Sequence, residues 1–209
     1  MDWGTLGQTA AQFLIDYFAV VVGAICGALF AVDRKLDIVG TVTLGLIAGY
    51  GGGIIRDMLL HDKGFFFMQS PELILVCIVL CTLVSVFRKH VAGLQSHLFY
   101  VDAFSMALFA LAGAGKAWAA GVGIVISIFL GGLTAVGGGA LRDICTGQTP
   151  AVFKPSNFYA VSGIAGSAAY VALAALNAPG PVADIACVAV AFLLTVLSAH
   201  FDWQTKSSE

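Results

Sequence analysis

The chain has 209 residues, of which 59% are hydrophobic and only 11% charged, and its formal net charge is −2. Soluble globular proteins are about 45–50% apolar and about 25% charged, so this composition excludes a soluble domain, a disordered chain and a coiled coil. The near-neutral charge provides no basic surface, and no nucleic-acid partner is expected. A membrane-spanning helix needs about 20 apolar residues, so the chain has room for seven spans joined by short loops.

Charged residues and Pro–Gly breaks divide the chain into seven apolar segments. In chain order they predict helices over 12–32, Ile38–Ile55, Leu73–Phe87, Ala103–Gly115 with a continuation to Ala120, Gly121–Leu141, Pro155–Asn177 and Asp184–Phe201. Met1–Gln12 carries no Lys or Arg, unlike a signal peptide, so the first segment is expected to remain as a helix. The predicted fold class is an all-α integral membrane protein, with one membrane domain over 1–209.

The distribution of basic residues predicts the orientation in the membrane. With seven spans the two termini lie on opposite sides, and Lys and Arg collect on the cytoplasmic side. The C-terminal side receives Arg34, Lys35, Arg88, Lys89, Arg142, Lys154 and Lys206, whereas the N-terminal side receives Arg56, Lys63 and Lys116. The excess predicts an N-terminus outside the cell and a cytoplasmic C-terminus.

The sequence also repeats itself. Residues 16–57 align without a gap on residues 102–143, 86 positions later, and 15 of the 42 positions are identical. Asp16 aligns with Asp102, and a GGGxxRD motif occurs in both copies. The repeat contains three helices, an odd number, so its two copies enter the membrane from opposite sides, as in the inverted repeats of transporters.

We therefore predict two inverted three-helix repeats, over residues 12–90 and 98–177, followed by a seventh helix over 182–201. In the two motifs the glycines are Gly51, Gly52 and Gly53 in the first copy and Gly137, Gly138 and Gly139 in the second. Three consecutive glycines favour a bend or an unwound turn, which inside a membrane is tolerated where it lines a cavity, and freed carbonyls there can bind cations. The alternative is close helix packing, and one face could pack while the other lines a pore.

The charged residues of the motifs need partners in the membrane. Arg56 and Arg142 either reach the interface at a helix end or pair with carboxylates. Side chains at adjacent helix positions diverge, so Arg56 is expected to pair with a residue other than Asp57. The candidates are Asp16, Asp102 and Asp143, and the inverted symmetry suggests the hypothesis of pairing between the two halves. Asp16 and Asp102 begin the first helix of each half, where they either line a pore or interact with the helix dipole. Two arginines in a pore would oppose cation flow, so these residues leave the sign of the permeating ion open.

Lys116 has no equivalent in the first repeat, since the position 86 residues earlier is Phe30. It lies near Trp118, where a lysine can extend to the membrane interface. The alternative is a charge that gates or senses voltage. The four histidines and five cysteines are scattered, so neither a metal site nor a disulfide framework is expected, and no motif indicates an enzyme.

The duplicated GGGxxRD motif, at Gly51–Asp57 and Gly137–Asp143, resembles the prokaryotic trimeric intracellular cation (TRIC) channel family, also described as two-domain glycine-transporter-type or UPF0126-like membrane proteins. The resemblance covers about 16–200 and implies a homotrimer in the prokaryotic inner membrane, surrounded by lipids, with one pore in each subunit. It implies conduction of K⁺ (or Na⁺), with no cofactor, between second and fifth helices kinked at the glycines. It further implies that Arg56, Arg142 and Lys116 are pore or gating residues.

Three functions remain open at this stage. The first is an ion channel, which the resemblance and the paired glycine motifs favour. The second is a secondary transporter of a small solute such as glycine, because inverted repeats and broken helices suit it equally. The third is a structural membrane protein that conducts nothing.

Overall fold

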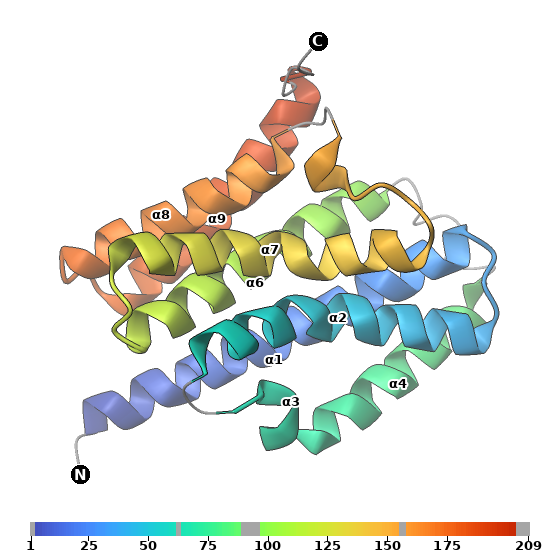
Figure 1. Ribbon diagram of the computed structural model, residues 1–209, viewed down its shortest axis with the longest axis horizontal. Helices are drawn as coiled ribbons and strands as arrows, with labels where there is room; N and C mark the ends of the chain where they lie inside the picture. Colours follow the sequence, from blue (N-terminus) through green and yellow to red (C-terminus); the bar gives the residue numbers. More distant parts are fainter. Residues whose placement is uncertain (1–2, 62–63, 89–96, 155–157, 204–209) are drawn as a thin grey trace.

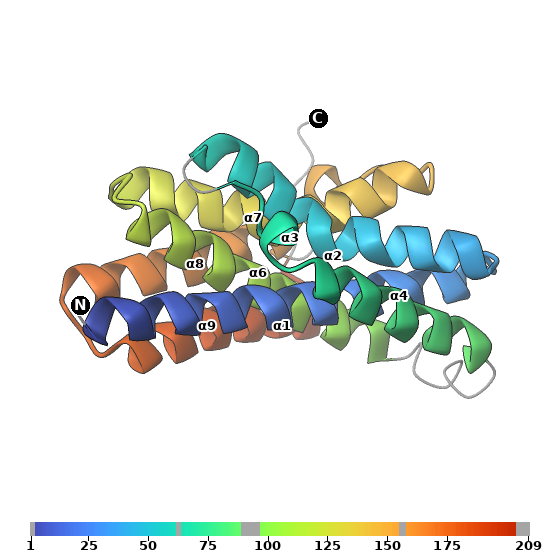
Figure 2. The ribbon, with the colours of Figure 1, turned by 90° about the horizontal axis from the view of Figure 1, so that it is seen from below.

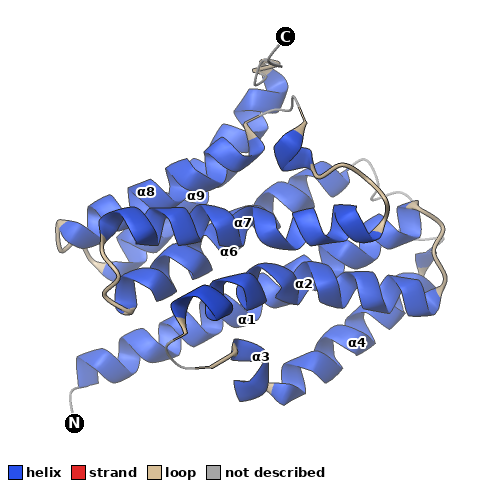
Figure 3. Cartoon of the chain, viewed as in Figure 1, coloured by secondary structure: helices blue, strands red, loops and turns tan. Residues whose placement is uncertain are grey.

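The computed structural model describes residues 3–61, 64–88, 97–154 and 158–203. These residues form helices and connecting loops and contain no strand (Figure 3). The long helices are α1 (Trp3–Asp33), α2 (Ile38–Leu60), α4 (Pro71–Val86), α6 (Leu98–Ala119), α7 (Ile124–Cys145), α8 (Tyr159–Ala175) and α9 (Gly180–His200). Two short helices, α3 (Phe66–Gln69) and η2 (Ala151–Phe153), follow α2 and α7.

The predicted all-helical membrane fold is confirmed. In the described part of the chain, five helices are long and apolar enough to cross a membrane, and α4 and α8 are shorter apolar helices. Each predicted segment overlaps one of these seven helices, although the helix ends differ from the predicted ends. The expected start at Pro155, the end of the first repeat at residues 89–90, and Lys63, Lys89 and Lys206 lie outside the described residues.

Two boundary differences have clear local causes. The helix expected from Gly121 begins at Ile124, because Gly121 and Gly123 adopt positive φ angles of 72° and 88° that a helix does not accommodate. The second helix does not end at Ile55 but continues to Leu60, and a residue in left-handed conformation, His61, then ends it. The extension places both charged residues of the first motif inside a helix.

The two halves pack in the same way. Helices α1, α2 and α4 contact one another in the first half, as α6, α7 and α8 do in the second. Helices α2 and α7 lie side by side in the middle of the molecule and run in opposite directions (Figure 1). This antiparallel contact is the one an inverted repeat requires, while α9 packs against α6 and α8 outside the repeat (Figure 2).

Glycines bring the first two helices of each half close together. A Cβ atom added at Gly27 of α1 would lie 3.0 Å from the Cα of Gly45 in α2. At the equivalent position of the second half, a Cβ added at Gly113 would lie 2.9 Å from the Cα of Gly131. Lipid supplies no hydrophobic drive between membrane helices, so small residues that allow close van der Waals contact stabilise these pairs.

Candidate functional site

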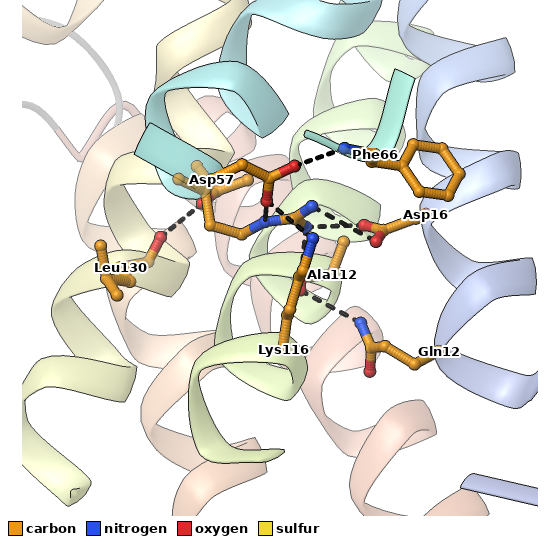
Figure 4. Close-up of polar contacts among 9 residues, drawn as sticks. Gln12, Asp16, Asp57, Phe66, Ala112, Lys116 and Leu130 are labelled. Carbon is orange, nitrogen blue, oxygen red and sulfur yellow. Dashed lines mark hydrogen bonds and ion pairs between the residues drawn. The ribbon is translucent and has the colours of Figure 1, made fainter. Parts of the chain in front are cut away.

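A buried arginine organises the first polar cluster. The Arg56 side chain, in the last turns of α2, is only 1% exposed. Its Nη1 donates to Oδ1 of Asp16 at 2.6 Å and its Nε to Oδ1 of Asp57 at 2.8 Å. Nη1 also donates to the backbone carbonyl of Ala112 in α6 at 3.2 Å. One guanidinium thus connects α1, α2 and α6 (Figure 4).

Asp57 accepts three different donors in this cluster. Besides the guanidinium, Nζ of Lys116 lies 2.8 Å from Oδ1, and the backbone N–H of Phe66 donates to Oδ2 at 2.8 Å. Phe66 is the first residue of α3, so the carboxylate satisfies an amide that the short helix leaves free. Figure 4 shows Lys116 extending from α6 toward Asp57, while Asp16 approaches from α1.

The second cluster repeats this arrangement at the other copy of the motif. Nη1 of Arg142 donates to Oδ1 of Asp102 at 2.7 Å, and its Nη2 lies 3.0 Å from Oδ1 of Asp143. The backbone N–H of Ala151, the first residue of η2, donates to Oδ2 of Asp143 at 3.2 Å. Each half therefore contains one buried arginine that two aspartates hold. The carboxylate of the second aspartate also accepts a hydrogen bond from the first residue of the next short helix.

The hypothesis that Arg56 and Arg142 pair with aspartates of the opposite half is wrong. Each arginine pairs with the first-helix aspartate of its own half and with the aspartate that follows it, Asp57 or Asp143. Adjacent Cβ atoms do diverge, but the long arginine side chain curves back far enough for its guanidinium to meet the neighbouring carboxylate. Among the described residues, Lys116 and Asp57 form an ionic contact that does cross between the halves.

Lys116 is also not simply extended to the interface beside Trp118. Its side chain is 21% exposed, whereas the carboxylate that it contacts belongs to a side chain only 2% exposed. Phe66 is buried in the core next to α1 and α4. In both cases the buried Asp57 carboxylate provides hydrogen-bond partners that the amino-acid pattern did not reveal.

The expected unwinding at the glycines is also wrong. Both α2 and α7 are continuous helices through their three glycines. An added Cβ at Gly52 would overlap the backbone carbonyl of Thr134, and one at Gly138 would overlap that of Ala48. Glycine is required here because the two backbones touch, which is the close-packing alternative.

The third glycine of each motif has a different environment. A Cβ at Gly53 would meet only Nη2 of Arg56, at 3.9 Å, whereas one at Gly139 would lie 3.3 Å from the Tyr159 hydroxyl and 3.8 Å from Nη2 of Arg142. The first two glycines of each motif thus pack against the facing helix, whereas Gly53 leaves space beside its guanidinium and Gly139 lies close to Tyr159 of α8. A cavity of about 10 Å³ adjoins Gly139 and Arg142, enough for about one water molecule.

Sequence reasoning missed several residues of the second cluster, among them Cys26 and Phe30. The Sγ of Cys26 lies 3.3 Å from Oδ1 of Asp102 and 3.9 Å from Nη1 of Arg142. The ring of Phe30 covers the Arg142 guanidinium, with 4.2 Å between Cζ and the ring centroid. The signal for both was the repeat itself, because they occupy the positions equivalent to Ala112 and Lys116.

These features define a helical membrane protein built from an inverted repeat around two buried arginine clusters. Residues 13–89 and 99–175 each match the family described as glycine transporter, and the chain belongs to this family. The UPF0126 membrane protein of Deinococcus radiodurans is 31% identical over 156 residues, covering 74% of this chain and 73% of that protein. The UPF0126 inner membrane protein YadS of Escherichia coli K12 is 29% identical over 93% of both chains.

Solved structures of TRIC channels share the fold. The TRIC trimeric intracellular cation channel orthologue from Rhodobacter sphaeroides superposes with a TM-score of 0.85 and 34% identity, over 92% of this chain and 98% of that chain. A TRIC cation channel studied for its conductance gives a TM-score of 0.83 with 28% identity, over 94% of this chain and 96% of that one. The structural neighbours are thus cation channels rather than enzymes, and the predicted family is confirmed.

Proposed function

We propose that the protein is a homotrimeric channel for monovalent cations, chiefly K⁺, with one pathway in each subunit between α2 and α7. The proposal extends to this chain the function of its structural neighbours, which are TRIC cation channels. Residues 12–90 and 98–177 would form the two repeats and 182–201 the seventh helix of one membrane domain over 1–209, in a prokaryotic inner membrane with the N-terminus outside.

The observation that carries this proposal is the neutralisation of both motif arginines. An unpaired arginine in a pore would repel cations, but two aspartates accompany each one at hydrogen-bond distance. No net positive charge then remains as a barrier, and carboxylate oxygens lie beside the arginine of each motif. Burying an ion pair costs desolvation free energy, so stability alone does not explain why both halves contain one. An ion pathway does explain it.

The proposed pathway follows the arginine clusters and the motif glycines. Its residues would be Asp16, Arg56, Asp102, Arg142, Gly51, Gly52, Gly53, Gly137, Gly138 and Gly139, with Lys116 as the gating residue. In the present conformation the backbones of α2 and α7 touch, so conduction would require them to separate. The carboxylates would then offer oxygen ligands to a partly hydrated cation.

A second candidate function is the secondary transport of a small solute such as glycine. The description of the matching family favours it, and an inverted repeat suits alternating access as well as a pore. A transporter would saturate with its substrate and couple uptake to an ion gradient. A channel would give unitary currents without such coupling.

Planar-bilayer recording of the purified protein in a KCl gradient tests the proposal. We expect unitary currents that reverse near the K⁺ equilibrium potential. Trimers that give no current, but whose liposomes accumulate radiolabelled glycine with saturation, would replace the channel by the transporter. The Lys154→Gln variant is a suitable control for both assays, because this exposed lysine lies outside the two clusters.

A further inference from the structure

The two charged clusters have their arginine and both aspartates at equivalent positions of the repeat, and each arginine also contacts the opposite half. Nη1 of Arg56 reaches the carbonyl of Ala112, and Nη1 of Arg142 reaches Sγ of Cys26. Ala112 and Cys26 occupy equivalent positions of the repeat, 86 residues apart. A pseudo-two-fold axis thus relates the clusters in space as well as in sequence.

One pair of equivalent positions breaks this symmetry in charge. At the first cluster Lys116 places its ammonium 2.8 Å from Oδ1 of Asp57. At the second cluster the equivalent residue is Phe30, whose ring covers Arg142 at 4.2 Å. The first cluster therefore balances two carboxylates with two cations, whereas the second has two carboxylates and one cation.

A further arginine does not restore the balance. The guanidinium of Arg34 lies on the Phe30 ring, 4.6 Å from its centroid, and its own side chain is exposed next to Asp33. Water and the neighbouring carboxylate screen this charge. The ring thus separates a solvated surface cation from the buried cluster.

The most exposed members of the two clusters also differ in sign. In the first cluster the most exposed charged side chain is that of Lys116, at 21%. In the second cluster it is that of Asp102, at 23%. Asp102 lies near the start of α6 and Lys116 in its last turn, so these two side chains lie toward opposite ends of that helix. One end therefore presents a cation to an approaching ion and the other an anion.

We propose that the Lys116/Phe30 pair sets the direction in which the pathway rectifies. This inference rests on the proposed channel function and goes beyond it by assigning a role to Phe30. A pathway with perfect two-fold symmetry in the membrane plane would pass equal currents in both directions. The second cluster, with one carboxylate in excess, raises the local cation concentration at its mouth, whereas the neutral first cluster does not. Cation current is then larger when it enters from the Asp102 end.

Exchanging the two residues tests this inference directly. In symmetric KCl we expect wild-type single channels to pass unequal currents at equal positive and negative voltages. Lys116→Phe alone makes both clusters Phe-type, and Phe30→Lys alone makes both Lys-type, so each single variant should give a linear current–voltage relation. The double variant F30K/K116F should rectify again, in the opposite direction.

The direction of rectification of the double variant is measured in membrane patches of expressing cells, because biosynthesis fixes the orientation of the protein there. A C-terminal reporter checks that orientation.

Controls separate charge from packing. Lys116→Gln removes the ammonium with little loss of length and should give a linear relation even if Lys116→Phe fails to fold. Lys116→Arg should keep the wild-type direction, and Arg34→Gln should keep it because that charge lies outside the ring.

Wild-type channels that conduct without rectification, or single variants that rectify as wild type does, would overturn the inference and leave the channel function intact. An absence of any current in wild type would instead overturn the proposed function.

Discussion

At the scale of single residues, the two motif arginines are anchors of the fold as well as candidates for the pathway. Arg56 has one of the least exposed side chains in the described structure and holds α1, α2 and α6 together through Asp16, Asp57 and the Ala112 carbonyl. Removing one member of a buried ion pair leaves the other charge uncompensated in a medium of low dielectric constant.

Arg56→Ala should therefore lower the free energy of unfolding by about 3–5 kcal/mol, the range measured when a buried pair is broken. Arg34→Ala is the matched control, since Arg34 forms an exposed pair with Asp33 at 3.8 Å, and should cost at most about 1 kcal/mol. Thermal unfolding of the purified proteins in detergent checks both. Equal midpoints for the two variants would show that Arg56 contributes no more than a surface residue.

Lys116→Gln should change the open probability of the channel or its voltage dependence while the protein stays folded. The Asp57 carboxylate keeps the Arg56 guanidinium and the Phe66 amide when the ammonium is lost, so the cluster remains partly compensated. A charge within the membrane field also contributes to voltage dependence. Bilayer recordings of Lys116→Gln beside Lys154→Gln check this, and identical behaviour of the two variants would reduce Lys116 to a structural role.

At the scale of helices, the contact between α2 and α7 depends on which glycine of each triplet faces the other helix. Gly52 and Gly138 face the backbone of the opposite helix, whereas Gly53 faces only the Arg56 guanidinium and Gly139 faces Tyr159 of α8 and the Arg142 guanidinium. Neighbouring glycines of one triplet thus have different roles: Gly52 allows close helix packing, and Gly53 borders open space. Substitutions at neighbouring glycines should accordingly have opposite outcomes.

Gly52→Ala should lower the free energy of unfolding by about 1–3 kcal/mol or more, because the new methyl overlaps the Thr134 carbonyl and the helices must move apart. Gly53→Ala is the control and should be tolerated, since its methyl meets only Arg56, at 3.9 Å. Both replace a helical glycine by alanine and gain the same helix propensity. Thermal midpoints in detergent compare them, and equal stability would contradict the packing role of Gly52.

At the scale of the whole molecule, two inverted halves meet along α2 and α7, and α9 lies outside the repeat against α6 and α8. The halves touch closely, so the proposed function requires that they separate. A covalent bond across the contact would prevent this motion without removing any charged residue. The structure offers a suitable pair of positions for such a bond.

The double variant G51C/L141C should form a disulfide that abolishes conduction. A Cβ at Gly51 would lie 3.7 Å from that of Leu141, close to the mean separation of about 3.8 Å in disulfides. A Cys145→Ser background removes the exposed native thiol, while the other four cysteines are buried. We expect oxidation to stop the currents, reduction to restore them, and the single variants to respond to neither. Normal currents through the oxidised double variant would show that α2 and α7 do not separate.

The amino-acid sequence by itself determined the architecture and the identity of the charged residues. Helix existence follows from the length of the apolar segments between charges, and the inverted topology follows from a shift of 86 residues over an odd number of helices. Both predictions depend only on local composition and on the number of helices, so they can be made without knowledge of tertiary contacts. The same shift pairs Lys116 with Phe30, which is already visible in the sequence.

Only the tertiary structure decided which partner each of these residues has. Arg56 pairs with Asp16, 40 residues away in its own half, and Lys116 pairs with Asp57 of the other half. The packing of α1, α2 and α6 brings these atoms together. Helical continuity at the glycines was likewise decided by the facing backbones of Thr134 and Ala48, which leave no room for a Cβ. Glycine is compatible both with an unwound turn and with a close contact, and only the neighbouring helix distinguishes the two.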